Sequence, residues 1–322
     1  MTSSVALCTY NGERYIREQL ESILDQTMPV DEIVVCDDGS TDGTLQIIES
    51  FIGTTDTTIH IHRNENNLGP AKNFQKAINL CSGDIIFLSD QDDLWMPEKV
   101  ETIVHYFDFN PGHQVVYTDA YLIDSNGQPI AGETLWNCFG MTPKAQKYID
   151  EGFGIELFAN ENRATGATMA VRKGYKYLPN IADYCKGDIL HDGVLAMLSA
   201  ADNQLGCISR KLIDYRIHPG QECGIGESLR HPVSDDPRKS SYTAVYWSQN
   251  NLPAPLTRRI RFIVTRRRHQ QQPLGALRMV GHIAEYRKLY RSHWHSFLIY
   301  DITKWFSDMW HRIKKKCQQS PS

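Results

Sequence analysis

Short apolar runs alternate with segments of helical periodicity along the first 120 residues. The pattern predicts strands at 5–8, 32–36, 58–62, 84–89 and 115–118, and helices at 12–26, 41–51, 70–80 and 97–107. β-Branched runs such as Ile33-Val34-Val35 are typical of strands that are buried on both faces of a parallel sheet. The alternation therefore predicts βαβ units and an α/β fold, in which a mostly parallel central sheet has helices on both faces.

The second half of the chain is less regular. A further strand is expected at 167–171 and a further helix at 189–201. Residues 124–165 are expected to be irregular, and residues 219–255 to be rich in loops. A segment as long as 124–165 inside a compact domain is typical of a functional loop or of a disordered one.

Composition excludes a disordered chain, and charge divides the chain into two parts. Of 322 residues, 41% are hydrophobic and 22% are charged, which is typical of a globular protein. The formal net charge is −4, but 256–316 contains 15 Lys+Arg and 3 Asp+Glu, so this segment carries +12 and the rest −16. We expect an acidic body at 1–225, a linker at 226–255 and a basic helical extension at 256–322.

Polar segments follow three of the predicted strands, at the point where each strand ends. They are Thr9–Glu13, Asp37–Ser40 and Asp90–Asp93. Parallel sheets bind ligands at the carboxyl ends of their strands, so these segments are expected to converge on one crevice. The five aspartates among them repel one another unless a cation or hydrogen-bond donors neutralise their charge. Oxygen ligands suit Mg²⁺ or Mn²⁺, and an ion held by few carboxylates usually also binds phosphates, which predicts a metal-bridged phosphorylated ligand.

Each acidic segment also has a simpler interpretation. Asp37–Ser40 has the composition of a turn that precedes a helix cap. Asp90–Asp93 can act as a loop cap before the helix that begins near Pro97. Three acids directly after a strand are costly without a cation, which favours the metal site for the second segment.

In combination, these motifs resemble a known family. The matching segments are Cys8–Asn11, Asp37–Asp42, Asn67–Gly69, Ser89–Trp95, His191–Gly193 and Tyr215–His218. They resemble family 2 glycosyltransferases of the GT-A fold, and among these the bacterial rhamnosyltransferase-like enzymes of surface polysaccharide assembly. The resemblance covers about residues 3–225. It implies a Rossmann-like GT-A domain that binds a nucleotide-sugar, with the basic helical extension added after it.

The resemblance also implies a reaction and the residues that perform it. A sugar would pass, with inversion and with Mg²⁺ or Mn²⁺, from a nucleotide-diphosphate donor to a saccharide or lipid-linked saccharide. Rhamnose from dTDP-rhamnose is favoured, and UDP-hexoses are the alternative. The catalytic base would be Asp192, and the metal would be bound by Asp92 and His218. Donor-binding residues would be Thr9, Asn11, Glu13, Asp38, Lys72, Asp90 and Asp93, with Asp38 at the nucleobase.

Several of these roles have rivals. Asp188 lies four residues before Asp192, on the same face of the predicted helix, and is the alternative base. His218 can bind the diphosphate instead of the metal, or can be a structural hydrogen-bonding residue. Lys72 can be a solvated helix residue.

Two other classes of function are open. A sugar nucleotidyltransferase is also an α/β protein with metal-binding acids, but that class usually has a glycine-rich phosphate loop, whereas Thr9–Glu13 contains one glycine. A non-catalytic assembly partner that keeps a GT-A fold is the other alternative.

The basic extension has the pattern of an amphipathic helix. Apolar residues from Trp294 to Ile313 recur at helical spacing, with Lys314–Lys316 beside them and a further basic cluster at Arg266–Arg268. This is typical of a helix that lies on an anionic membrane surface, although a helix packed on the body has the same stripe. Nucleic acid is not expected as a partner, because no recognised binding motif accompanies the charge.

The cysteines and the N-terminal segment bear on localisation. None of the eight cysteines has CxxC spacing, so we expect reduced thiols in a cytosolic protein. No apolar run approaches the roughly 18 residues of a membrane span, and the N-terminus has no pattern of a secretory signal. A cytoplasmic protein is expected, with peripheral attachment to the inner face of the cell membrane if the basic extension binds lipid.

Overall fold

The computed structural model describes residues 1–152, 154–158, 162–185, 190–221, 302 and 306. The chain divides into two compact units, Met1–Asp236 and Pro237–Ser322, and the helices and strands described below belong to the first. The predicted linker at 226–255 lies outside the described residues, as does the predicted extension at 256–322 apart from residues 302 and 306. These two domain assignments remain predictions.

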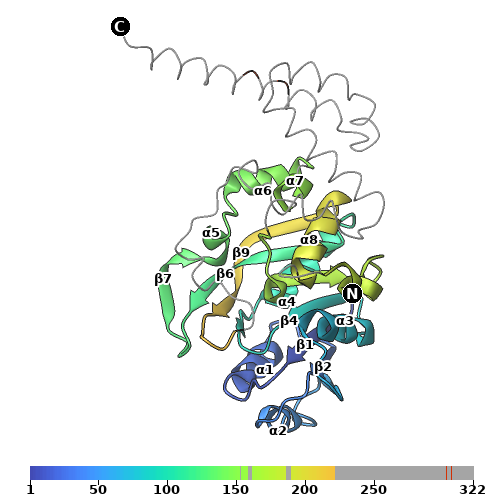
Figure 1. Cartoon of the computed structure of the whole chain (residues 1–322), viewed down its shortest axis with the longest axis vertical. Coiled ribbons are helices and arrows are strands. Elements are labelled where there is room, and N and C mark those ends of the chain that lie inside the picture. Colours follow the sequence, from blue (N-terminus) through green and yellow to red (C-terminus); the bar gives the residue numbers. More distant parts are fainter. Residues whose placement is uncertain (153, 159–161, 186–189, 222–301, 303–305, 307–322) are drawn as a thin grey trace. The chain divides into compact units, whose positions relative to one another are not determined.

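Strands and helices alternate through the first unit, and Figure 1 shows their arrangement. The first half contains β1 (Ser3–Thr9), α1 (Ile16–Leu24), β2 (Glu32–Asp37), α2 (Thr44–Glu49), β3 (Thr58–Arg63), α3 (Pro70–Leu80), β4 (Ile85–Ser89), β5 (Leu94–Trp95) and α4 (Lys99–Phe109). The second half contains β6 (Val115–Ile123), β7 (Pro129–Thr134), α5 (Leu135–Cys138), α6 (Pro143–Asp150), α7 (Gly154–Phe158), η1 (Gly166–Thr168), β8 (Met169–Arg172), η2 (Leu178–Tyr184), α8 (His191–Ala201) and β9 (Leu205–Arg216).

One sheet joins all the described strands, in the order β3-β2-β1-β4-β8-β6-β9-β5, with β7 paired to β6. The strands β1, β2, β3 and β4 are mutually parallel, and β9 runs parallel to β6. The prediction of an α/β fold with a mostly parallel sheet is thereby confirmed. β8 is inserted antiparallel between β4 and β6. Because of this direction, the segment before β8 lies at the same edge of the sheet as the end of β4.

The strands are apolar throughout because both faces of the sheet are covered. Val5 and Leu7 of β1 share a core with Ile16 and Leu20 of α1. Side chains alternate across a strand, so the equally buried Ala6 points to the other face. There α3 packs on β1 and β2. Helices therefore cover both faces, as the run pattern predicts.

The prediction of an irregular segment at 124–165 is wrong. This segment contains β7, α5, α6 and α7, which are all short. β7 is mostly exposed and, among the described strands, pairs only with β6, so burial imposes no clear alternation on it. The start of α6 was nevertheless marked in the sequence, since Thr142 caps the helix through a bond from Ala145 N and Pro143 occupies the first turn.

The long strand β9 is also missed by the pattern. Half of its positions are buried, among them Leu212, Ile213 and Arg216, whereas the polar residues at 209–211 are exposed or half-buried, so no simple alternation marks the strand. Six cysteines lie among the described residues, and all six are free thiols. No helix in the described ranges is both long enough and apolar enough to span a bilayer.

Candidate active site

The carboxyl ends of β1, β2 and β4, together with the segments before β8 and α8, line one cavity of about 310 Å³. Four carboxyl groups face it: Asp38, Asp90, Asp92 and Asp192. The strand-end segments thus come together at the edge of the sheet where a parallel α/β fold binds its ligands.

Asp38 is fixed at the β2 end of the cavity. Its side chain is 4% exposed, and its carboxylate accepts hydrogen bonds from Asn64 Nδ2 at 2.7 Å, Leu68 N at 2.8 Å and Gly69 N at 2.9 Å. Gly69 has φ of +77°, which favours glycine, and this turn aims the two backbone N–H groups at the carboxylate. Lys76 donates to Asn64 Oδ1 at 2.6 Å and so supports the same network from α3.

The neighbouring Asp37 has a structural role. It is completely buried and accepts hydrogen bonds from Thr9 Oγ1 at 2.9 Å and Ser40 N at 2.9 Å. The Thr9 hydroxyl is therefore used within the protein, although Thr9 also lines the cavity. The first acidic segment was open to two interpretations, a turn and a binding site. Asp37 stabilises the turn, whereas Asp38 lines the cavity.

Asn11 and Glu13 hold the loop before α2. Asn11 has φ of +48° and accepts from Thr41 N at 2.9 Å through Oδ1. Glu13 Oε2 accepts from Gly43 N at 2.8 Å. Both side chains are exposed, and neither is among the described residues that line the cavity. Lys72 is likewise exposed, on α3, and is not among those lining residues.

The acidic turn after β4 is joined to the end of β9. Asp92 Oδ2 lies 2.8 Å from His218 Nε2, and both side chains are largely buried. Gly220 N donates to His218 Nδ1 at 3.2 Å, so in the neutral ring the proton is on Nε2 and points at Asp92. The fold thus brings together two residues that are 126 positions apart and that the resemblance assigns to the metal.

Asp93 lies beneath this turn and not among the described residues that line the cavity. It is 1% exposed, and its Oδ1 accepts from Arg216 N at 3.0 Å. Burial raises the pKa of Asp93 well above its usual range, and the charges of Asp92 and Asp90 raise it further. These contacts describe an acid that braces the turn, whereas the prediction that it contacts the donor remains untested.

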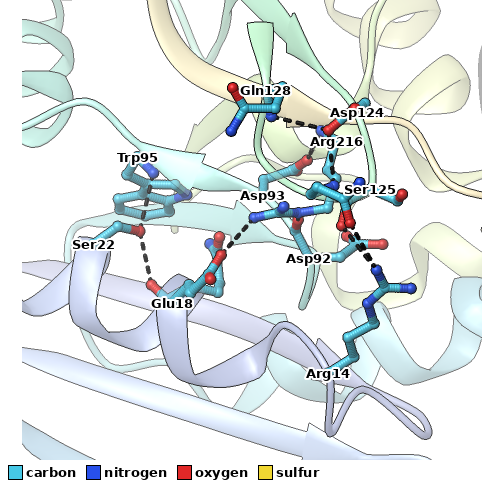
Figure 2. Close-up of polar contacts among 12 residues, drawn as sticks. Arg14, Glu18, Ser22, Asp92, Asp93, Trp95, Asp124, Ser125, Gln128 and Arg216 are labelled. Carbon is cyan, nitrogen blue, oxygen red and sulfur yellow. Dashed lines mark hydrogen bonds and ion pairs between the residues drawn. The ribbon is translucent and has the colours of Figure 1, made fainter.

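Arg216 is the central support of the acidic turn, and no role is predicted for it from the sequence. Its side chain is 2% exposed. It donates from Nε to the backbone oxygen of Asp92 at 2.7 Å and from Nη2 to Glu18 Oε2 at 2.8 Å. Figure 2 shows the guanidinium reaching from β9 to α1 beside the acidic turn. Its position in the Tyr215–His218 motif was the signal that could have identified it.

Gln91 joins the loops that follow β1 and β4. Its amide oxygen accepts from Tyr10 N at 2.8 Å, and its amide nitrogen donates to Tyr10 O at 3.0 Å. This pair fixes the spacing between the two loops. It gives a structural reason for an amide between two carboxylates in Asp90-Gln91-Asp92.

His191 and Asp192 open α8, and both line the cavity. Asp192 is half-buried, and its Oδ1 accepts from Gly193 N at 2.6 Å. His191 is 5% exposed and stacks on Phe74 of α3, with ring centroids 4.1 Å apart. The rival base, Asp188, lies outside the described residues. The structure therefore places Asp192 at the cavity, and the choice between Asp192 and Asp188 as the base remains a prediction.

The residues present suit a divalent ion that is held jointly with a ligand. In the part of the chain that the structure describes, no three His, Cys, Asp or Glu side chains form a closed metal site. Mg²⁺ is usually held by one or two carboxylates and completes its shell with water and substrate phosphates. Asp92 and His218 in contact, with Asp90 lining the same cavity, fit such an open site.

Comparison with known proteins assigns the chain to a family. Residues 4–160 match the family model "Glycosyl transferase family 2". The dTDP-rhamnosyl transferase RfbG of Shigella flexneri is 41% identical over 234 residues, which are 70% of this chain and 75% of RfbG. The chain belongs to glycosyltransferase family 2 and is a glycosyltransferase.

Other relatives are matched over smaller parts of their length. Chondroitin synthase of Escherichia coli is 34% identical over 174 residues, which are 54% of this chain and 25% of that protein. The match to EpsE of Bacillus subtilis (strain 168) covers 38% of this chain and 45% of that protein. The chain thus spans less than half the length of these two relatives.

Among solved structures, S. aureus TarS 1-349 in complex with UDP-GlcNAc is similar with a TM-score of 0.53 and 19% identity. The similarity covers 95% of this chain and 89% of that chain. At this level of identity the similarity shows the fold alone, which is the GT-A fold.

Proposed function

We propose that this chain transfers a sugar from a nucleotide-diphosphate donor to a saccharide or lipid-linked saccharide in the synthesis of a bacterial surface polysaccharide. The observation that carries the proposal is the shared cavity of Asp38, Asp92 and Asp192, with His218 in contact with Asp92. These groups match the three parts of such a donor: a nucleobase, a diphosphate and a sugar.

The order of the strands sets the order of the donor's parts. Asp38 follows β2, and Asp92 follows β4, with β1 between them. Gly166 precedes β8 on the other side of β4, and Asp192 lines the same cavity. A donor with its base at Asp38 and its diphosphate at Asp92 then has its sugar towards Gly166 and Asp192. Thr9 and Asp90 lie along the path of the nucleotide.

Asp92 and His218 would hold Mg²⁺ or Mn²⁺, which when bound offsets the charge that develops on the leaving nucleoside diphosphate. Use of His218 Nε2 as a ligand requires the ring proton to move to Nδ1, and the bond from Gly220 N would then be lost. Asp92 and Asp90 orient the diphosphate end of the donor. Arg216 keeps the backbone of the turn in place.

Asp192 is the base of the proposed reaction. Its carboxylate accepts the proton of the acceptor hydroxyl as that oxygen forms a bond to the anomeric carbon. The bond from the anomeric carbon to the phosphate oxygen breaks, and the nucleoside diphosphate leaves with that electron pair. A single displacement with a single base inverts the anomeric configuration.

Rhamnose from dTDP-rhamnose is the proposed donor sugar. The support is the 41% identity to a relative that is named as a dTDP-rhamnosyl transferase, over 70% of this chain. The abequosyltransferase RfbV of Salmonella typhimurium (strain LT2) is 32% identical over 126 residues, which are 38% of this chain and 36% of RfbV. UDP-hexoses form the alternative donor class.

Release of nucleoside diphosphate from a panel of dTDP- and UDP-sugars tests the proposal. With an extract of lipid-linked saccharides as acceptor, we expect turnover with Mn²⁺ or Mg²⁺ and its loss in EDTA. Asp92→Ala should lower kcat/KM at least about 100-fold, because loss of even a partner behind the metal ligands costs about 10- to 100-fold. Asp108→Ala, which removes an exposed carboxylate on α4, is the matched control and should act as wild type. Full activity of Asp92→Ala would contradict the proposed role of the metal.

The same assay distinguishes the other classes of function. A sugar nucleotidyltransferase would release pyrophosphate from a nucleoside triphosphate and a sugar phosphate. A non-catalytic partner would bind a nucleotide-sugar without turnover, whichever acceptor is supplied. Either result would replace the proposal.

We further propose that the chain is cytoplasmic and attaches to the anionic inner face of the cell membrane through 256–322. The support is the +12 charge and the apolar stripe of that segment. The full chain should sediment with phosphatidylserine vesicles and not with phosphatidylcholine vesicles. Replacing Arg266–Arg268 and Lys314–Lys316 by Gln should weaken this binding at least tenfold, at about 1 kcal/mol per basic residue. Unchanged sedimentation would exclude an electrostatic attachment.

A further inference from the structure

His191 is buried in the wall of the cavity, and neither of its ring nitrogens has a hydrogen-bond partner among the described residues. Its side chain is 5% exposed. Buried polar atoms are almost always paired, because an unmade hydrogen bond costs about 1–3 kcal/mol. The position of the ring at the cavity makes a bound ligand the natural partner.

The packing around His191 holds the ring in the wall of the cavity with both of its nitrogens buried. One face of the ring stacks on Phe74, with an interplanar angle of 26°. A Cβ atom at Gly166 would lie 2.9 Å from His191 Nε2, so any other residue there would crowd the ring. Phe74 and Gly166 both line the cavity beside His191. The stack fixes the ring plane, and the glycine leaves the Nε2 edge uncovered by a side chain.

The charge state of the ring favours a hydroxyl group over a phosphate. Burial lowers the pKa of His191, so the ring is neutral near pH 7 although Asp192 beside it favours the charged form. A neutral imidazole offers one N–H donor and one acceptor nitrogen, which matches a hydroxyl group. An anionic phosphate would instead meet a neutral ring and a neighbouring carboxylate.

The position of His191 assigns the hydroxyl to the transferred sugar. His191 is adjacent to the proposed base and lies against Gly166, which precedes β8. In the sheet, β8 follows β4 on the side away from β1 and β2, whereas Asp38 follows β2. A nucleobase at Asp38 and a diphosphate at Asp92 leave the sugar as the part of the donor that reaches this ring.

We infer that His191 recognises the donor sugar by a hydrogen bond to one of its hydroxyl groups and so contributes to the choice of donor. This inference rests on the proposed function. His191 would contact the substrate directly, whereas Phe74 and Gly166 position its ring.

The test compares two substitutions with opposite losses. His191→Phe keeps a ring on Phe74 and removes both nitrogens, whereas His191→Gln loses the aromatic stack and keeps a donor and an acceptor. Calorimetry with Mn²⁺ gives the affinity for dTDP and for dTDP-rhamnose, and turnover gives kcat/KM for the same donor. His191→Phe should bind dTDP as wild type does but lose about 10- to 100-fold in kcat/KM and in the affinity contributed by the sugar. His191→Gln should recover at least part of that loss.

His113→Phe is the matched control. His113 also stacks on an aromatic ring, that of Tyr106, and does not line the cavity in the described part of the chain. This variant should lose no more than twofold in kcat/KM. Thermal unfolding of every variant separates loss of the fold from loss of recognition.

Donors that lack one sugar hydroxyl group identify the hydroxyl that His191 binds. The kcat/KM of wild type should fall with one of these monodeoxy donors, whereas the kcat/KM of His191→Phe should not fall further with that donor.

The outcomes separate this inference from the proposed function. If wild type binds and transfers none of the nucleotide-sugars in the panel, the proposed function is wrong and the inference with it. If wild type transfers sugar while folded His191→Phe stays within twofold of it, only the inference is wrong. A weaker His191→Gln than His191→Phe would show that the ring acts by stacking, and a change confined to the KM of the acceptor would assign it to the acceptor. Both results would overturn the inference.

Discussion

At the scale of single residues, Arg216 shows how one buried cation supports a site that it does not line. Its guanidinium joins the backbone of Asp92 to Glu18 of α1, while its own backbone N–H holds Asp93. A buried charge is tolerated only when it is well paired, and here the partners are a carboxylate and a carbonyl. Arg216 therefore couples the position of the acidic turn to α1 and β9.

Arg216→Lys keeps the positive charge but removes the fork that reaches two partners at once. We expect a loss of about 2 kcal/mol in the free energy of unfolding, and about tenfold weaker Mn²⁺-dependent donor binding, because the turn loses its support. Thermal unfolding and calorimetry measure the two effects.

Glu18→Gln provides the comparison for this prediction. Glu18 is 57% exposed, so weakening this end of the ion pair should cost no more than about 1 kcal/mol. If Arg216→Lys matched wild type in stability and in donor affinity, the supporting role of Arg216 would be wrong.

At the scale of elements, the parts that pattern reasoning predicts are those that burial forces to be regular. The strands β1, β2 and β4 are buried along their whole length, so their sequences are apolar runs that can be recognised as strands from the sequence. β7 lies exposed on β6, and α5 and α7 have four and five residues, too few to establish a period. The antiparallel insertion of β8 depends on pairing across the sheet, which no local pattern encodes.

The junction of η1 with α8 leads to a prediction at this scale. Gly166→Ala places a methyl group 2.9 Å from His191 Nε2 and 3.7 Å from Asp192 Cβ, so the ring must move. A misplacement of about 1 Å at a catalytic site can lower the rate about 100-fold. For Gly166→Ala we expect the KM for the donor to rise about tenfold.

Gly174→Ala is a control two positions after the end of β8. A Cβ atom at Gly174 meets nothing within 4 Å. Neither Gly166 nor Gly174 has a positive φ, so alanine strains the backbone at neither position. Gly174→Ala should leave the donor KM unchanged, whereas Gly166→Ala should raise it, and thermal unfolding shows whether Gly166→Ala remains folded. Equal kinetics would mean that the contact between Gly166 and His191 has no bearing on the donor.

At the scale of the whole molecule, the site is assembled from segments that the sheet brings together over long distances in the chain. Sequence reasoning anticipates this for Asp38, Asp90, Asp92 and Asp192, which line the cavity, and for His218, which contacts Asp92. Motif position does not reveal whether a side chain faces the ligand or the protein. Thus Asn11 and Glu13 bind the loop before α2, and Arg216 supports the turn, because local hydrogen bonding decides these orientations.

The most direct test of the account measures Mn²⁺ binding by electron paramagnetic resonance, with and without dTDP. The cavity supplies few protein ligands, so wild type should bind Mn²⁺ weakly alone and at least tenfold more tightly when the diphosphate completes the shell. Asp92→Ala should remove most of this gain. The claim that these acids hold a diphosphate through a divalent ion would be contradicted by two results together. They are an affinity for Mn²⁺ that changes neither with dTDP nor in Asp92→Ala, and full sugar transfer in EDTA.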